Sequence, residues 1–330
     1  MAKFLSLRFL NYLLLSFLAT SFAFLLSAKL MHPEEVLYPP MATKPVPPET
    51  AQMYLNARNI NPADSLMTRY TRWLTDLLHG NLGVTAGTNK AMTPVLEVLQ
   101  TRIPMSLRLV VLGTAIGVVL GILVGMVSAV RRNSLGDRAT TMFSFLVLSL
   151  PTVVAILVVQ QINQSIMDAT GHGLPAINPI NPLLEPGSWA DIKYQAQALV
   201  MPTIVLAMFG MASYSRYMKV TTLDVLGSDY LRTARAKGLT KSKAMTRHGL
   251  RMALIPMGQY LAFAVGAAFA GSLFIEMMFN WNGIGSFGVQ ALQMADVNGT
   301  AGVVLYSAIL TLMSATLADF LQGLLDPRIR

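Results

Sequence analysis

The stretch from Leu107 to Val130 reads LRLVVLGTAIGVVLGILVGMVSAV and is apolar almost throughout. A helix needs roughly 20 mostly apolar residues to cross a hydrocarbon core of about 30 Å, so this stretch is long enough to span a membrane. Gly113, Gly117, Gly121 and Gly125 recur within it at every fourth position. They form one bare stripe on a helix, which predicts close packing against a second helix, with lining of a ligand path as the alternative.

The composition of the whole chain extends this interpretation beyond one stretch. The 330 residues are 53% hydrophobic and only 12% charged, whereas soluble domains carry about a quarter charged residues. We therefore expect an all-α, polytopic membrane protein with a single transmembrane domain over residues 1–330. Its six predicted membrane helices lie near residues 9–30, 107–130, 139–162, 198–214, 254–279 and 301–325.

The first predicted helix, residues 9–30, also has the basic start of a secretory signal peptide. Its apolar run is longer than a typical signal core of about 7–15 residues, and no clear small-x-small cleavage pattern precedes His32. We therefore expect an uncleaved membrane helix.

The basic residues concentrate between the fourth and fifth predicted helices. Residues 215–253 contain nine basic and two acidic residues, and short loops rich in Lys and Arg stay in the cytoplasm. The net charge of +9 thus indicates membrane orientation and not nucleic-acid binding. Six crossings leave both termini in the cytoplasm and residues 31–106 outside, as an external cap. There the pattern predicts an amphipathic helix that lies at the membrane interface or docks an external partner. Its apolar face carries Tyr70, Trp73, Leu74, Leu77 and Leu78, and its polar face carries Arg69, Arg72 and Asp76.

Small residues also line one side of the fifth predicted helix. They are Gly258, Ala262, Gly266 and Ala270. Two such stripes favour a compact helix bundle. Three predicted helices carry a proline that should bend or break them, at Pro151, Pro202 and Pro256.

Ionisable residues in the predicted helices lie near the helix ends. They are Arg108, Glu276 and Asp319. Ion-coupled carriers place such groups near the membrane midplane, so an autonomous channel or ion-coupled carrier is disfavoured. Arg108 is interpreted as an interfacial residue, with a selectivity charge as the alternative.

An intramembrane enzyme would need a convergent nucleophile or metal set. The chain has no cysteine, and its four histidines are scattered at His32, His79, His172 and His248. No catalytic residue and no metal site are predicted.

Active transport would need an energy source outside this chain, because the sequence contains no G-x-x-x-x-G-K-[ST] phosphate-binding loop. The basic loop instead offers a short stretch with helix signals. Ser228 is a suitable N-cap and Gly238 a suitable C-terminal stop, which predicts a capped, freestanding helix leading to a second helix from Lys241. Small Ala234 and Ala236 would let it dock closely in a partner's cleft, and a solvated loop is the alternative.

This stretch resembles the cytoplasmic "EAA" loop of binding-protein-dependent ABC permeases, in the form found in dipeptide and oligopeptide permeases. The matching positions are Asp229, Tyr230, Thr233, Ala234, Arg235, Ala236, Lys237 and Gly238. Further short motifs resemble the B-type peptide permease in the same order along the chain. They are Arg72-Trp73-Leu74, Gly80-Asn81-Leu82-Gly83, Pro94-Val95, Arg102-Ile103-Pro104, Gly283-Ile284-Gly285 and the terminal residues 325–330.

The resemblance implies the six-helix, MetI-like fold of a type I ABC importer permease in a bacterial inner membrane. It implies a second homologous permease subunit, two ATPase subunits that carry ATP and Mg, and an external substrate-binding protein, with no cofactor in this chain. The implied ATPase-coupling residues are Asp229, Tyr230, Arg232, Thr233, Ala234, Arg235, Ala236, Lys237, Gly238 and Leu239.

The implied substrates are di- and oligopeptides, with nickel, another small solute or antimicrobial peptides as alternatives. Asn282, Gly283 and Gly285 belong to a glycine-rich segment that would line an outer gate or form an ordinary turn.

Overall fold

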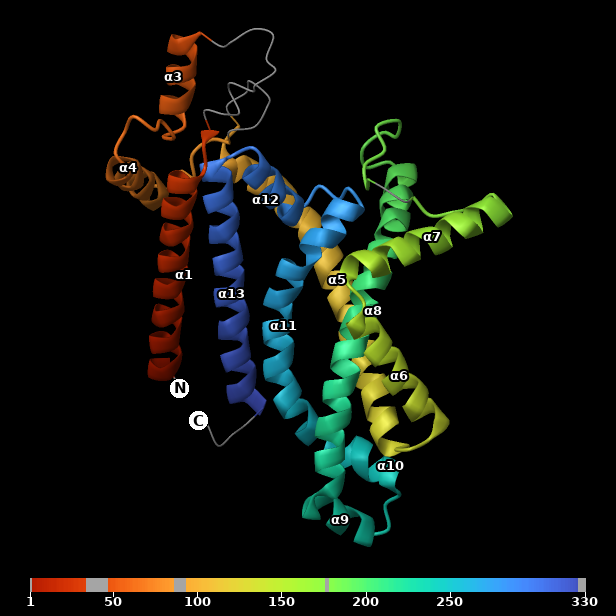
Figure 1. The fold of residues 1–330 in the computed structure, drawn as a ribbon. Helices are drawn as coiled ribbons and strands as arrows, with labels where there is room; N and C mark the ends of the chain where they lie inside the picture. Colours follow the sequence, from red (N-terminus) through yellow and green to blue (C-terminus); the bar gives the residue numbers. More distant parts are fainter. Residues whose placement is uncertain (1, 34–46, 86–92, 176–177, 326–330) are drawn as a thin grey trace. The chain divides into compact units, whose positions relative to one another are not determined.

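The computed structural model describes residues 2–33, 47–85, 93–175 and 178–325 (Figure 1). Within these ranges every regular element is a helix, and one isolated antiparallel bridge joins Val84 to Pro94. The all-helical expectation is therefore confirmed. The chain divides into two compact units, one of Met1–Leu5, Leu107–Trp281 and Ser314–Arg330, the other of Ser6–Ser106 and Asn282–Met313.

The first unit is organised around a long helix, α8, which runs over Trp189–Gly227. The elements α6 (Leu135–Ser149), α7 (Thr152–Thr170) and α11 (Leu250–Met278) contact α8. The later part of α5 (Val95–Val130) lies on α8 through the first glycine stripe. Three short elements follow the end of α8: α9 (Asp229–Ala236), α10 (Lys241–Ala244) and the π-helix η1 (Met245–Gly249) (Figure 1).

The predicted third membrane helix is two helices. α6 ends at Ser149, α7 begins at Thr152, and their axes differ by 110°. Pro151 occupies the N-cap position of α7, where its missing N–H and fixed φ prevent α6 from continuing. Pro202 and Pro256, by contrast, lie inside α8 and α11 without ending them.

Four helices in the described ranges are long and apolar enough to cross a membrane, and the α6–α7 pair would make a fifth span. The four are Arg8–Leu30, Val95–Val130, Trp189–Gly227 and Val297–Phe320. α11 occupies the place of the predicted fifth helix, but the side chains of residues 261–265 and 267–271 lie outside the described part of the chain.

The helices extend beyond the apolar segments that predicted them. α8 continues through residues 215–227, so the basic connection starts as helix and not as loop. Hydropathy ended the prediction near Tyr214, whereas buried Met218 and Thr222 keep the next turns packed within the protein. α5 likewise begins at Val95, ahead of its membrane-spanning stretch.

The second unit contains most of α1 (Ala2–Leu30) and of α13 (Val297–Leu325), which lie side by side (Figure 1). Ser16 Oγ donates a hydrogen bond to Ala308 O at 3.3 Å between them. The unit also holds α3 (Pro48–Ala57), α4 (Leu66–Leu78) and α12 (Ile284–Gln293). Residues 34–46 of the segment predicted to be external lie outside the described residues.

The amphipathic helix predicted in the external cap is α4. Its Trp73 is 4% exposed and stacks on Phe24 of α1 at 4.6 Å between ring centroids. The aromatic face of α4 thus fastens the cap to α1 within the chain. Arg69, expected on the polar face, is buried, and its Nη1 donates to Ala28 O at 3.1 Å.

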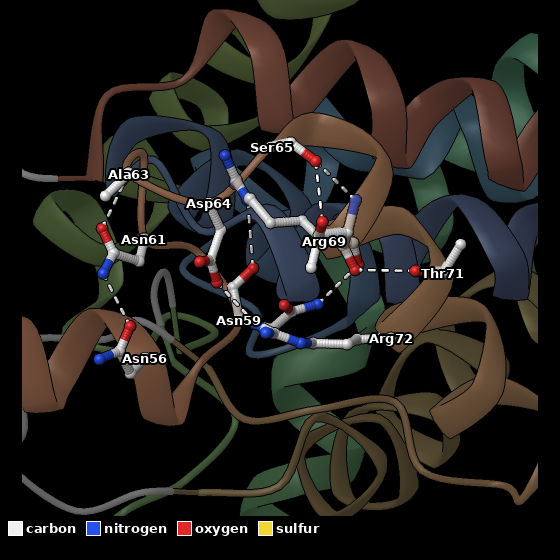
Figure 2. Close-up of polar contacts among 10 residues, drawn as sticks. Asn56, Asn59, Asn61, Ala63, Asp64, Ser65, Arg69, Thr71 and Arg72 are labelled. Carbon is white, nitrogen blue, oxygen red and sulfur yellow. Dashed lines mark hydrogen bonds and ion pairs between the residues drawn. The ribbon is translucent and has the colours of Figure 1, made fainter.

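Side-chain hydrogen bonds fix the turn between α3 and α4 (Figure 2). Asn59 Nδ2 donates to Arg69 O at 2.7 Å, and Arg69 Nε donates back to Asn59 O at 3.3 Å. Arg72 forms an ion pair with Asp64 at 2.6 Å. The cap is therefore held by polar contacts in the α3–α4 turn and by the stacking of Trp73 on Phe24.

Candidate functional site

The helix α9 starts after a sharp break in the chain at Ser228. This residue is extended, with φ −74° and ψ 148°, and its hydroxyl donates to Val225 O at 2.6 Å. Ser228 therefore occupies the N-cap position of α9 as predicted, but its side chain makes no capping hydrogen bond to α9 and satisfies a carbonyl at the end of α8. One residue closes the long helix and redirects the chain into the short one.

A single buried side chain holds α9 to the rest of the first unit. Leu231 has no exposed surface and lies in an apolar cluster with Ala244 and Met245, on which Val225 and Leu250 also pack. The sequence predicted a freestanding helix, and this prediction is wrong because Leu231 packs α9 onto its neighbours. Ala234, expected to face a partner, is partly buried against the same cluster.

Gly249 makes this anchorage possible. A Cβ atom at position 249 would stand 3.0 Å from Leu231 Cδ1 and 3.1 Å from Val225 Cγ1. Both separations are tighter than normal carbon contacts of about 3.5–4.0 Å. Neither Leu231 nor Gly249 was singled out from the sequence, although an apolar residue within a basic, polar helix was an available signal.

The remaining surface of α9 is exposed and mainly basic. Asp229, Arg232, Thr233, Arg235, Ala236 and Lys237 are all exposed, and Tyr230 is 56% exposed. The ion pair between Arg232 and Asp229 spans 3.3 Å, with both side chains largely in solvent, so it contributes little to stability. These residues are available to a partner without disrupting the packing that holds the helix.

Gly238 ends the helix as predicted. Its φ is +92°, in the left-handed region that glycine adopts without strain, and its N–H donates to Arg235 O at 2.9 Å. Open space surrounds the position where its Cβ would be. Leu239, next in the chain, packs on the cluster around Leu231.

The chain then enters α11 without leaving helical geometry. α10 and η1 lead directly to Leu250, and η1 is a π-type turn. Such turns are rare and are frequent at functional sites. α9 is therefore linked to one long helix, α8, on its N-terminal side and to another, α11, on its C-terminal side.

The four glycines of the first stripe all face α8. A Cβ at Gly113 would approach Leu206 Cβ to 2.5 Å, and one at Gly121 would approach Tyr214 Cβ to 2.5 Å. Gly117 lies against Ala207 and Gly210, and Gly125 against Ser215 and Met218. The stripe therefore brings the α5 and α8 backbones together.

The second stripe is placed only in part. Gly258 is buried, and a Cβ at Gly266 would stand 3.4 Å from Ser314 Oγ of α13. The side chains of Ala262 and Ala270 lie outside the described part of the chain.

The predicted gate segment opens α12, in the second unit. Gly283 is the extended N-cap of α12, Gly285 lies in its first turn, and Asn282 precedes both. Ser106 Oγ accepts a hydrogen bond from Ile284 N at 2.8 Å, and Arg102 Nη2 donates to Gln290 Oε1 at 3.3 Å. The start of α12 and its later part are therefore both tied to the first half of α5.

A buried ion pair that the sequence did not suggest lies between α6 and α8. Asp137 is 6% exposed and pairs with Lys219. It also accepts hydrogen bonds from Ser128 Oγ and, at 2.9 Å, from Asn133 N. An acid within a basic turn was the available signal, but its partner is distant in the sequence. Among the described residues, no three His, Asp or Glu side chains gather where a metal ion would bind.

The comparisons with known proteins agree with one another. Residues 117–330 match the model of a family described as "Binding-protein-dependent transport system inner membrane component". These residues include α9 and both of its neighbouring long helices. The matched region covers more than half of the chain.

Three relatives illustrate the range of similarity. The oligopeptide transport system permease protein OppB of Mycobacterium tuberculosis (strain ATCC 25618 / H37Rv) is 35% identical over 338 residues, which cover 100% of this chain and 99% of that protein. AppB of Bacillus subtilis (strain 168), also an oligopeptide permease, is 31% identical over 81% of each chain. The dipeptide transport system permease protein DppB of Escherichia coli (strain K12) is 30% identical, over 79% of this chain and 80% of that protein.

Proposed function

We propose that this chain, which belongs to the family of binding-protein-dependent transport system inner membrane components, is the permease subunit of an ATP-driven importer of di- and oligopeptides. The single observation that carries the proposal is α9, an exposed basic helix anchored by buried Leu231 between two long helices. That arrangement suits a mechanical link to a partner, and the sequence contains no phosphate-binding loop of its own.

The substrate class is supported by the relatives. The oligopeptide permease OppB aligns with this chain from end to end, and the dipeptide permease DppB over about four fifths of it. The same architecture importing nickel, another small solute or antimicrobial peptides is the alternative. It would differ in what the external binding protein delivers.

In the proposed mechanism, Asp229 to Leu239 seat in a cleft of a cytoplasmic ATPase subunit. ATP and Mg bind the ATPase subunits and supply the driving force, and this chain holds neither. Closure of the ATPase pair moves α9 as a rigid body that pivots at the buried Leu231 side chain. The displacement passes through α10 and η1 into α11 and through Ser228 into α8, which switches the pathway between inward-facing and outward-facing states.

The proposed assembly contains a second homologous permease subunit, two ATPase subunits and an external substrate-binding protein. Six crossings by α1, α5, the α6–α7 pair, α8, α11 and α13 place both termini and α9 in the cytoplasm. The charge of residues 215–253 supports this orientation. On the external side, Asn282, Gly283 and Gly285 at the start of α12 line the outer gate, and the α3–α4 cap lies outside the membrane.

The proposal is tested with the complete complex in proteoliposomes. ATP-dependent uptake of a labelled oligopeptide should require the binding protein, and Arg235→Glu should lower uptake at least 10-fold because it reverses a charge on the docking face. Arg132→Glu, on the exposed turn before α6, is the matched control and should retain uptake.

Two further measurements separate the parts of the proposal. ATPase subunits should co-purify less with the Arg235→Glu protein than with the control. Full uptake by the Arg235→Glu protein would contradict the coupling role. Uptake of nickel but of no peptide would contradict the substrate class.

A further inference from the structure

A groove of about 540 Å³ lies on the surface between α6 and α8, within the same unit as α9. Its volume falls in the range of about 300–1,000 Å³ that small-molecule clefts occupy. The lining residues are Asp137, Arg138, Thr141, Met142, Phe145, Leu146 and Lys219. We refer to it as the α6–α8 groove.

One end of the groove is positively charged. Arg138 is exposed, and Lys219, whose side chain is 23% exposed, donates to Thr141 Oγ1 at 3.0 Å as well as to Asp137. Asp137 is the one acid in the lining, and Ser128 and Asn133 engage it from within the protein. Arg216, one turn before Lys219, places its guanidinium 4.3 Å from the Phe145 ring centroid. Arg138 and Lys219 thus lie at this end, and Arg216 lies farther along the groove, beside Phe145. With one acid in the lining, positive charge is in excess.

The other end of the groove is apolar and open. Met142, Phe145 and Leu146 are 65%, 53% and 55% exposed. They follow Arg138 on α6 at helical spacing, and eight residues of helix separate Arg138 from Leu146 by about 12 Å. Because α6 forms part of a candidate membrane span, its apolar end lies at acyl-chain depth while its charged end lies near the headgroups.

We propose that the α6–α8 groove binds an anionic phospholipid. Its phosphate lies beside Arg138 and Lys219, Arg216 beside Phe145 adds to the positive potential along the groove, and the start of an acyl chain lies on Met142 and Leu146. Charge decides against an apolar helix of a partner as the occupant, because such a helix would bury Arg138 and Arg216 without a counter-ion. The proposal depends on the membrane embedding of α6 and is independent of which substrate is transported.

The test is lipid binding to the intact, purified transporter complex, titrated with phosphatidylglycerol or phosphatidylcholine and followed by native mass spectrometry. The wild type should retain one phosphatidylglycerol more tightly than phosphatidylcholine. A surface cation contributes about 1 kcal/mol toward an anionic lipid, so Arg138→Gln/Arg216→Gln should weaken phosphatidylglycerol binding about 30-fold. The matched control Arg131→Gln/Arg132→Gln removes the same charge from the adjacent turn, outside the groove, and should keep the wild-type affinity.

The same titration is repeated with Arg138→Gln alone, which changes an exposed position and keeps the Arg216 contact with Phe145. Its affinity for phosphatidylglycerol should fall about 5-fold. A photo-crosslinker at Leu146 should label lipid. The proposal is overturned by equal affinity for the two lipids, or by equal losses in the groove and control variants. It is also overturned if the crosslinker labels another polypeptide, or if inorganic phosphate displaces phosphatidylglycerol at a similar concentration, which would indicate an anion site that needs no lipid.

Discussion

The two basic connections of the first unit are held in opposite ways. Between α5 and α6, buried Asp137 is bound by Ser128, Asn133 and Lys219, so directional polar contacts join three helices. Between α8 and α11, the polar residues of α9 are exposed and its anchor is the apolar side chain of Leu231. Polar networks fix geometry, whereas an apolar contact tolerates small shifts. The first connection is therefore suited to a rigid frame and the second to a moving part.

Removing the buried acid should have the largest effect. Asp137→Leu leaves Lys219 without its carboxylate in a mostly buried position, which costs about 3–5 kcal/mol. Thermal unfolding of the purified protein should shift down sharply. Asp137→Leu/Lys219→Met removes both charges and should recover most of the loss; an equal loss in the double variant would contradict a role for the ion pair.

Truncating the anchor of α9 should have a smaller and more local effect. Leu231→Ala deletes a fully buried side chain, for which about 2–5 kcal/mol is typical. Hydrogen exchange should accelerate in residues 229–250 while α5 and α6 stay protected. Lys237→Ala, at an exposed position at the end of α9, is the control and should leave the exchange unchanged. Uniform acceleration across the unit would show that α9 is not a separable part.

The glycine stripe supports the frame, and its closest approach can be tested with a single methyl group. In Gly125→Ala the new Cβ meets Met218 Cβ at 2.9 Å and also Ser215 O, so overpacking should cost about 1–3 kcal/mol. Gly136→Ala is the matched control, because only Ser134 Oγ lies near its Cβ, at 3.9 Å. There the higher helix propensity of alanine should leave stability unchanged or slightly raised.

The smallest effect is expected at the end of α9. Gly238→Ala meets no neighbour but must hold a φ of +92°, which costs about 1–2 kcal/mol. The strain should loosen the α9 terminus and lower peptide uptake modestly, with no change in the melting temperature of the frame. An unfolding temperature as low as that of Gly125→Ala would contradict the division between frame and moving part.

Features that depend on neighbours in the sequence were predictable. Apolar length marked the candidate spans, the spacing of four predicted the α5 stripe, and the glycine at 238 marked the end of α9. Pro151 marked the break between α6 and α7, because its ring constrains the chain locally. The angle of 110° at that break was not predictable, since packing against α8 and α11 orients α7.

Features that depend on distant partners were missed or wrong. Arg69 lies among polar residues in α4 but is buried because Ala28 O accepts from its guanidinium. The residues of the Asp137–Lys219 pair are separated by 82 positions. No local pattern specifies such a contact.

The sequence by itself determined that this protein is helical, embedded in a membrane and equipped with a short basic helix at one side, because hydropathy, small-residue spacing and helix signals act over a few residues. The tertiary structure alone decided which face of α9 is anchored and which is exposed, that α5 lies on α8, and that one buried ion pair joins α6 to α8. These choices depend on long-range packing and on the cost of burying a charge without a partner, which a linear pattern does not record.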